Sequence, residues 1–425
     1  MKKISVFFIL VFTIQLATYS QGCLPNGISF SSQAEIDNFQ TNYPGCTEIE
    51  GHVSISGNDI TNVDGLSTIT SIGGYLEIIY NPSLSNVTGL EGITSVDGYI
   101  ALYYNDALTT LAGFKNLTTA GSHLEIVENP LLINLSGLES LVTVNEELIV
   151  AQNNALISLE GLSALTSVEM NLIIWGNPLL NSCESLSQLT TVSGVLQFNK
   201  NYALTSLSGL ESLTTIGNFL TINENIELSS LEGLNNITSI GGKLHIRRNY
   251  KLQNLNGLSS LQTMNGLLLV EDNSELTSLN GIGNINPITI DSVAIFDNPM
   301  LSTCEVQSIC NYISLPDALV NIHDNASGCN DIADVESACQ AVNIGELLFS
   351  DYYSIYPIPA HDKLSIKTLN NAVIDNISLF NQYGQKVLSI ENSDRIIDIS
   401  GLISGLYIIE ILNSDVKLRS KLIIK

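Results

Sequence analysis

Positive charge is scarce in this chain of 425 residues. Lys and Arg number 16, against 42 Asp and Glu, and the formal net charge is -26. Because proteins neutralise the phosphates of nucleic acids with clustered Lys and Arg, we expect no nucleic-acid partner. Charged residues of both signs make up only 14% of the chain, whereas 44% is hydrophobic. Such a chain can bury a large core, and its composition excludes a disordered acidic protein.

Long apolar runs are missing after the first twenty residues. No later stretch approaches the ~18 consecutive apolar residues of a membrane-spanning helix, so we expect no membrane span. At the N-terminus, Lys2 and Lys3 precede an apolar run from Ile4 to Leu16, and small or polar residues follow. This order is typical of a cleaved secretory signal peptide, which we place at residues 1–21.

Signatures of catalysis and of metal binding are also lacking. The five histidines share no motif, and no Gly-x-Ser-x-Gly, His-Glu-x-x-His, phosphate-binding loop or calcium nonapeptide occurs. We therefore expect no enzyme activity, no cofactor and no bound metal.

The seven cysteines form two groups and one isolated position. They are Cys23 and Cys46; Cys304, Cys310, Cys329 and Cys339; and Cys183. Because an exported protein can form disulfides, Cys23 and Cys46 make a natural pair. The second group allows three connectivities, of which we favour Cys304–Cys329 and Cys310–Cys339. A zinc site with His323 is the competing interpretation, but no Cys-x-x-Cys spacing supports it. Cys183 remains as a buried, inert thiol.

An asparagine recurs every 24 residues in the middle of the chain, and such a fixed period predicts a solenoid. The recurring positions are Asn81, Asn105, Asn129, Asn153, Asn177, Asn201, Asn225, Asn249 and Asn273, with Asn58, Asn298 and Asn325 close to the register. Side chains five and three residues before each Asn are apolar, which predicts a short strand with one face inward. A Leu follows three residues after the Asn, and a Gly usually follows eight after it.

The recurring Asn and Gly have structural explanations. An inward-facing Asn is tolerated only when it is hydrogen-bonded, and its amide can donate to and accept from the turn backbone of its own and the adjoining coil. Stacked coils would therefore form a ladder of Asn side chains. We expect the Gly at a tight bend that needs a positive φ or a close backbone approach.

The repeat, as in LEIIYNPSLSNVTGLEGITSV, resembles the receptor L domain, a relative of leucine-rich repeats found in growth-factor receptors and bacterial surface proteins. The opening fits as well, because Ser32 and Glu35 form a capping-box pattern before a short helix and GCTEIEGHVSISGN resembles the first strand. The resemblance implies an all-β protein, with a right-handed parallel β-helix, or leucine-rich-repeat-like solenoid, of about eleven 24-residue coils between disulfide caps. We place this solenoid at residues 22–340.

After a predicted linker at 341–354, the composition changes and strand-like runs follow. Residues 355–425, with YPIPAHDKL, NQYGQKV, IDISGLISGLYIIEI and KLIIK, resemble the type A C-terminal sorting domain of the type IX (Por) secretion system, a small antiparallel β-sandwich. The resemblance implies a bacterium of the Bacteroidetes type and contact of residues 355–425 with the type IX machinery. It also implies a protein that is secreted or held at the outer-membrane cell surface.

The outward positions of the predicted strands are where a ligand face is expected. Stacking coils about 4.8 Å apart would align these positions into columns, with an apolar strip in the N-terminal half. The candidate ligand face consists of Ile79, Tyr80, Tyr103, Tyr104, Ile149, Ile173 and Trp175. The alternative is that a sheet selects β-branched and aromatic residues anyway. A second hypothesis is a local anion contact on the coil that carries Lys243, Arg247, Arg248 and Lys251.

Together these features predict a non-enzymatic secreted or surface protein for binding or adhesion, whose solenoid face meets an unknown protein or glycan ligand. The alternative is a structural surface-layer or spacer protein without a specific ligand. A polysaccharide-active β-helix enzyme is more remote, because Glu77 and Glu125 lie two coils apart, about 10 Å, with Ala101 between them.

Overall fold

The computed structural model describes residues 22–342, 353–368, 374–381, 384–391, 396–413 and 416–425. The predicted signal peptide and most of the predicted linker, 343–352, lie outside these residues. The chain divides into two compact units, one up to Glu336 and one from Ser337 onward.

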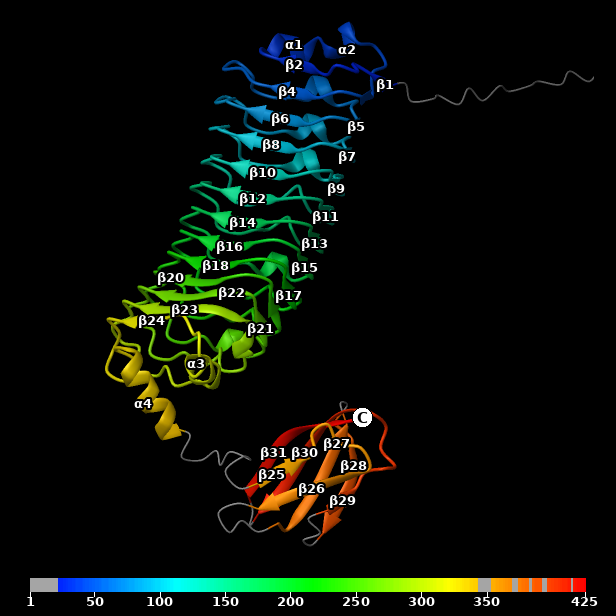
Figure 1. Cartoon of the computed structure of the whole chain (residues 1–425). Helices are drawn as coiled ribbons and strands as arrows, with labels where there is room; N and C mark the ends of the chain where they lie inside the picture. The colour runs from blue at the N-terminus through cyan, green and yellow to red at the C-terminus, as the bar shows by residue number, and fades with distance from the viewer. Residues whose placement is uncertain (1–21, 343–352, 369–373, 382–383, 392–395, 414–415) are drawn as a thin grey trace, which may run out of the picture. The chain divides into compact units, whose positions relative to one another are not determined.

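The first unit is a solenoid of stacked coils with two parallel sheets (Figure 1). The main sheet has 13 strands: β2 (Ile28–Phe30), β4 (Val53–Ile55), β6 (Leu76–Ile79), β8 (Ile100–Tyr103), β10 (Leu124–Val127), β12 (Leu148–Ala151), β14 (Leu172–Trp175), β16 (Leu196–Asn199), β18 (Leu220–Asn223), β20 (Leu244–Arg247), β22 (Gly266–Glu271), β23 (Ile290–Phe296) and β24 (Val320–His323). The side sheet has 11 two-residue strands: β1 (Gly22–Cys23), β3 (Glu48–Ile49), β5 (Ser71–Ile72), β7 (Ser95–Val96), β9 (Thr119–Ala120), β11 (Thr143–Val144), β13 (Ser167–Val168), β15 (Thr191–Val192), β17 (Thr215–Ile216), β19 (Ser239–Ile240) and β21 (Thr263–Met264).

Eleven coils contribute a strand to both sheets, as the period predicts, and β23 and β24 extend the main sheet further. Several coils also contain a short 3-10 turn between the main strand and the next side strand: η1 (Asp64–Leu66), η2 (Thr88–Leu90), η3 (Ala112–Phe114), η4 (Glu184–Leu186) and η5 (Asn256–Leu258), with η6 (Pro287–Thr289) near the end.

The core lies along the solenoid axis. The predicted inward positions, such as Leu124 and Ile126, are fully buried and pair in register with the same positions of both neighbouring coils. Burying each such side chain contributes about 1.5–3 kcal/mol. Cys183 lies in this core as a free thiol, and burial raises its pKa to about 12, so it stays protonated.

The Asn side chains form the predicted ladder, and those from Asn81 to Asn298 are 0% exposed. Asn153 represents the pattern. Its Oδ1 accepts from the backbone N–H of Asn129 at 3.0 Å, and its Nδ2 donates to the carbonyl of Ile126 at 2.8 Å and to that of Ala151 at 3.0 Å. Its own backbone N–H donates to Oδ1 of Asn177 at 3.0 Å. Each Asn therefore ties together three successive coils.

The ends of the ladder differ in one respect from the sequence pattern. Asn298 and Asn325 join it, and Nδ2 of Asn298 donates to Oδ1 of Asn325 at 3.0 Å. Asn58 does not, because it is exposed and Gly57 occupies the ladder register, where its N–H donates to Oδ1 of Asn81 at 2.9 Å.

The recurring Gly meets the expected backbone constraint. At Gly137 the φ angle is +117°, and a Cβ atom there would lie 2.1 Å from the carbonyl oxygen of Leu111 in the preceding coil. No other residue fits this approach without moving the neighbouring coil.

Helices and disulfides cap the solenoid. The N-terminal cap has α1 (Gln33–Asp37), α2 (Phe39–Asn42) and the disulfide Cys23–Cys46. The C-terminal cap has α3 (Gln307–Ile313), α4 (Ile332–Val342) and the disulfide Cys304–Cys329. Cys310 and Cys339 are disulfide-bonded as well, which agrees with the favoured pairing. The predicted capping box is incomplete: Ser32 is the N-cap residue of α1, but its side chain makes no cap hydrogen bond, and the Glu35 carboxylate accepts from the N–H and hydroxyl of Ser31.

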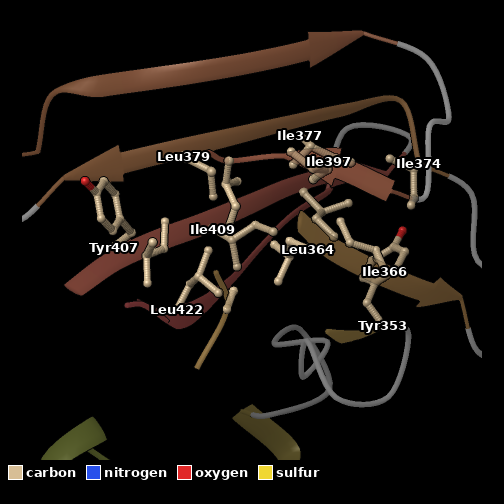
Figure 2. Packing of buried hydrophobic residues seen from close by; sticks show 14 residues of the cluster. Tyr353, Leu364, Ile366, Ile374, Ile377, Leu379, Ile397, Tyr407, Ile409 and Leu422 are labelled. Carbon is tan, nitrogen blue, oxygen red and sulfur yellow. The ribbon is translucent and has the colours of Figure 1, made fainter. Parts of the chain in front are cut away.

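The second unit contains two antiparallel sheets (Figure 2). One has β25 (Tyr353–Tyr356), β26 (Lys363–Thr368) and β29 (Ile396–Asp398), and the other β28 (Lys386–Glu391), β27 (Asn376–Asn381), β30 (Gly405–Asn413) and β31 (Val416–Ile424). Their core includes Leu364, Leu379 and Ile409. Since β25 pairs with β26, residues 353 and 354 of the predicted linker belong to this sandwich.

We expect Asn153→Ala to lower the free energy of unfolding by about 2–4 kcal/mol, because it removes the partners of the buried Asn129 N–H and the Ile126 carbonyl. Chemical denaturation followed by circular dichroism measures the change. Asn154→Ala, at the exposed next residue, is the control and should change stability by less than about 0.5 kcal/mol. Equal effects of the two substitutions would contradict the role of the ladder.

Candidate functional site

The outward side of the main sheet carries aligned columns of side chains. Glu77, Ala101 and Glu125 are successive partners in one column, as the period predicts. Burial, and secondarily the Glu147 carboxylate, raises the pKa of Glu125. Because Ala101 separates the two carboxylates, the column holds no adjacent acid pair of the kind that glycoside hydrolysis uses.

The candidate ligand face divides into two groups. In the first, Tyr80 and Tyr104 are 57% and 37% exposed, and their rings stack at 4.8 Å. Tyr103 lies edge-on to Tyr104 at 6.4 Å and pairs with Ile79. In the second group, Ile149 and Ile173 are register partners and Trp175 lies on the same strand as Ile173; all three are half-buried. The strand β10, with Glu125, separates the two groups.

A further aromatic column escaped the sequence interpretation. The rings of His52, Tyr75, Tyr99 and His123 stack in succession, with centroids 4.7, 4.8 and 4.6 Å apart. The Tyr99 hydroxyl donates to Oε1 of Glu77 at 2.5 Å. Burial, and then this bond, raises the pKa of Tyr99. The signal was visible six residues before Asn58, Asn81, Asn105 and Asn129, just outside the predicted strands.

The residue directly before each ladder Asn forms another column, which we call the turn column. None of its members is buried, and each has a positive φ. They are Tyr80, Tyr104, Glu128, Gln152, Gly176, Lys200, Glu224, Arg248, Asp272, Asp297 and Asp324. In many coils the Asn amide closes this turn by bonding the carbonyl two residues earlier, as from Asn153 to Ala151. A left-handed conformation costs a non-glycine residue about 1–2 kcal/mol, which the buried hydrogen bonds offset.

A pocket of about 380 Å³ lies along the turn column. Its walls come from turn-column residues, from the residues directly after the ladder Asn and from Trp175 at the end of β14. They are Asp106, Glu128, Pro130, Gln152, Asn154, Trp175, Gly176, Pro178, Lys200 and Tyr202. The pocket includes Trp175 from the candidate ligand face but none of the other six predicted residues. The sequence signal for this pocket was Gly176, because every other residue of the turn column carries a side chain.

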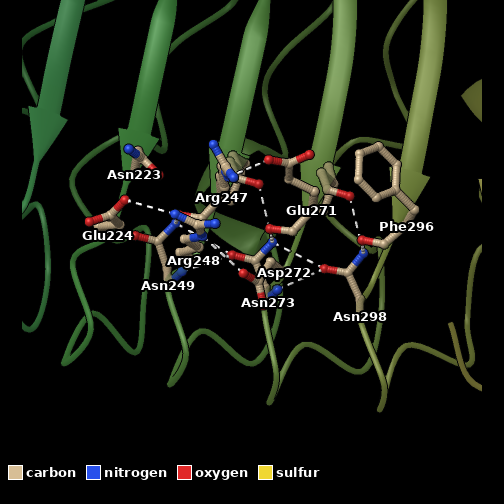
Figure 3. A network of polar contacts seen from close by, with 12 residues as sticks. Asn223, Glu224, Arg247, Arg248, Asn249, Glu271, Asp272, Asn273, Phe296 and Asn298 are labelled. Carbon is tan, nitrogen blue, oxygen red and sulfur yellow. Dashed lines mark hydrogen bonds and ion pairs between the residues drawn. The ribbon is translucent and has the colours of Figure 1, made fainter. Parts of the chain in front are cut away.

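Three of the four basic residues on the coil of Asn249, two coils beyond the pocket, are paired with acids (Figure 3). Arg248 bonds Asp272 through Nε at 3.0 Å and Glu224 through Nη1 at 3.2 Å, and Arg247 forms an ion pair with Glu271. Lys251 pairs with Glu227, and the ammonium of Lys243 lies 5.2 Å from the ring centroid of Phe219. These contacts occupy the cations that the anion hypothesis required.

His245 lies beside this network without a partner for Nε2 among the described residues. Burial, and then the charges of Lys243 and Arg247, lowers its pKa to about 4. The imidazole is therefore neutral at physiological pH.

The described part of the chain has neither a cluster of metal ligands nor a membrane-spanning helix. It contains no group of three or more His, Cys, Asp or Glu side chains arranged to hold a metal ion. None of its helices is both long and apolar enough to cross a bilayer.

Comparison with known families matches both parts of the resemblance. Residues 214–313 match the receptor L domain, and residues 354–425 match the secretion system C-terminal sorting domain. No curated protein matches the chain. A crystal structure of a TLR13–ssRNA13 complex shares 14% identity, covers 70% of this chain and has a TM-score of 0.18, which is too low to bear on the fold. The present chain spans 61% of the length of that matched chain.

We expect His245 to make stability depend on pH. Its folded pKa of about 4 lies below the ordinary 6.5, so the unfolded chain binds more protons between these values and stability falls as the pH drops from 6.5 toward 4. His245→Thr, which copies the register partner Thr221, should show a smaller loss between about pH 7.5 and about pH 5. Urea denaturation at both pH values measures it, and the difference between the two proteins isolates His245 from the many carboxylates. An equal loss in both would contradict the assignment.

Proposed function

We propose that this protein is exported through the type IX secretion system and binds a macromolecule, a protein or a glycan, at the cell surface or after release, without catalysing a reaction. The match of residues 354–425 to a secretion sorting domain supports export. The match of residues 214–313 to the receptor L domain supports a role in binding.

The observation that carries the binding role is the uncovered aromatic surface on the N-terminal half of the main sheet. Tyr80 and Tyr104 remain 57% and 37% exposed although they stack on each other. Aromatic side chains dominate the binding energy of interfaces because they bury large areas at little cost in conformational entropy. A solenoid that served only as a spacer would need no such rings outside its core, since the buried Leu and Ile already stabilise every coil.

Absence of catalysis follows, in this proposal, from the layout of the carboxylates. Glu77 and Glu125 are two coils apart, about 10 Å, whereas glycosidases place their two carboxyl groups about 5–9.5 Å apart. Tyr99 also holds Glu77 in a hydrogen bond.

The purified full chain is expected to bind a member of an array of glycans and extracellular matrix proteins. Trp175→Ala or Tyr103→Ala should weaken that binding about 10-fold or more while circular dichroism stays unchanged, because an aromatic contact at an interface contributes about 2 kcal/mol. Ile288→Ala is the control, since Ile288 is 76% exposed in η6, outside the face. The absence of any saturable ligand would favour the spacer. Release of new reducing ends from an arrayed glycan would contradict the absence of catalysis.

A further inference from the structure

We propose that the pocket around Gly176 is a subsite for a neutral oligosaccharide chain that lies along the solenoid axis. This inference rests on the proposed binding function and goes further, because it names a site and a ligand class.

The pocket exists because one side chain is missing from the turn column. Gly176 has the same left-handed backbone as its neighbours, with a φ of +67°, against +56° at both Gln152 and Lys200. A Cβ atom at Gly176 would lie 3.4 Å from Cγ of Gln152, which is ordinary van der Waals contact. Neither the backbone nor the packing therefore requires glycine here, in contrast to Gly137. The glycine leaves open the space beside Trp175.

The polar side chains around that space are free to meet a ligand. Elsewhere on the solenoid, polar side chains pair from coil to coil, as Asn223 does with Asn199 at 3.0 Å. Within the described residues, by contrast, the side chains of Asp106, Gln152 and Asn154 form no hydrogen bond. The Tyr202 hydroxyl and the indole N–H of Trp175 have no partner there either.

These groups suit a ligand that is rich in hydroxyl groups. The amides of Gln152 and Asn154 both donate and accept, and the Asp106 carboxylate accepts, so together they match hydroxyls that do both. The indole of Trp175 and the rings of Pro130 and Pro178 offer apolar surface to the C–H faces of sugar rings. A volume of about 380 Å³ lies within the range of small-ligand pockets.

The shape and the charge of the pocket narrow the class of ligand that it fits. The pocket runs from the coil of Asp106 to that of Tyr202, a span of four coil spacings or about 19 Å, which fits an extended chain better than a single ring. Two carboxylates, Asp106 and Glu128, face a single cation, Lys200, whose ammonium lies 3.9 Å from Glu224. An acidic sugar would be repelled. A peptide could not add as a strand, because the main-sheet strands here already pair on both sides.

Isothermal titration of the full chain with maltohexaose, cellohexaose, xylohexaose, mannohexaose and chitohexaose tests the proposal. One of these neutral hexasaccharides should bind with a stoichiometry of about one. Hexagalacturonate, which is acidic, should not bind. Gly176→Gln, which copies Gln152 from the preceding coil, should reduce the affinity at least about 10-fold by filling the pocket. Asp297→Gln is the matched control. It places the same side chain in the same column at the same φ, +56°, far along the chain, and should bind as the unmodified protein does.

Two further variants test the pocket should Gly176→Gln fail to fold. They are Asn154→Ala and Trp175→Asn, the second of which copies the register partner Asn199. Each should weaken oligosaccharide binding about 10-fold. Binding of no neutral hexasaccharide, or undiminished binding by folded Gly176→Gln, would overturn the proposal. If Gly176→Gln instead loses an arrayed protein, the pocket takes a protein and the saccharide class is wrong, while the proposed function stands.

Discussion

The buried Asn ladder is the constraint on which this solenoid depends. A polar side chain in the axial core is stable only when all its hydrogen-bonding groups are satisfied. The side chain of Asn153 meets that condition by bonding backbone groups of its own coil and of the preceding one, at Ala151, Ile126 and Asn129, while its backbone N–H donates to Oδ1 of Asn177 in the following coil. The bonds hold only if every coil presents its Asn at the same height, so the ladder keeps the main-sheet strands in register even where the spacing is 25 or 27 residues, at Asn298 and Asn325.

The same bonds determine the outer surface. Where each ladder Asn is tied to the neighbouring coils, the residue before it takes a left-handed backbone and its side chain stays outside the core. This produces the turn column, where one coil differs from the next only in the side chain it carries. The backbone of the column is therefore the same in every coil, and only the side chains differ. They give the stack of Tyr80 on Tyr104, Arg248 between two acids, and the open space at Gly176.

Alignment of the coils also explains the charge. Between Gly22 and Ile344 the chain has 6 Lys and Arg and 33 Asp and Glu. Stacked columns let the few cations pair across coils, as Arg248 does with Glu224 and Asp272. Most carboxylates have no such partner and remain outside, where they keep the solenoid acidic and repel anionic ligands. The outer surface therefore disfavours anionic partners, and the aromatic rings of the N-terminal half add contacts that do not depend on charge.

The sequence by itself determined the solenoid, the inward columns, the Asn ladder, the disulfide caps and the sorting domain, because each repeats a local pattern or a family motif. It also placed Trp175 among the candidate residues. Only the tertiary structure decided which outward residues share a site. The pocket joins positions before and after the ladder Asn from five coils, and the stacked rings from His52 to His123 lie just outside the strands. The physical reason is the direction of the turn. Periodicity shows which side chains alternate inward. The left-handed conformation of the residue before each ladder Asn, which turns the next side chains toward one another, depends on hydrogen bonds between coils.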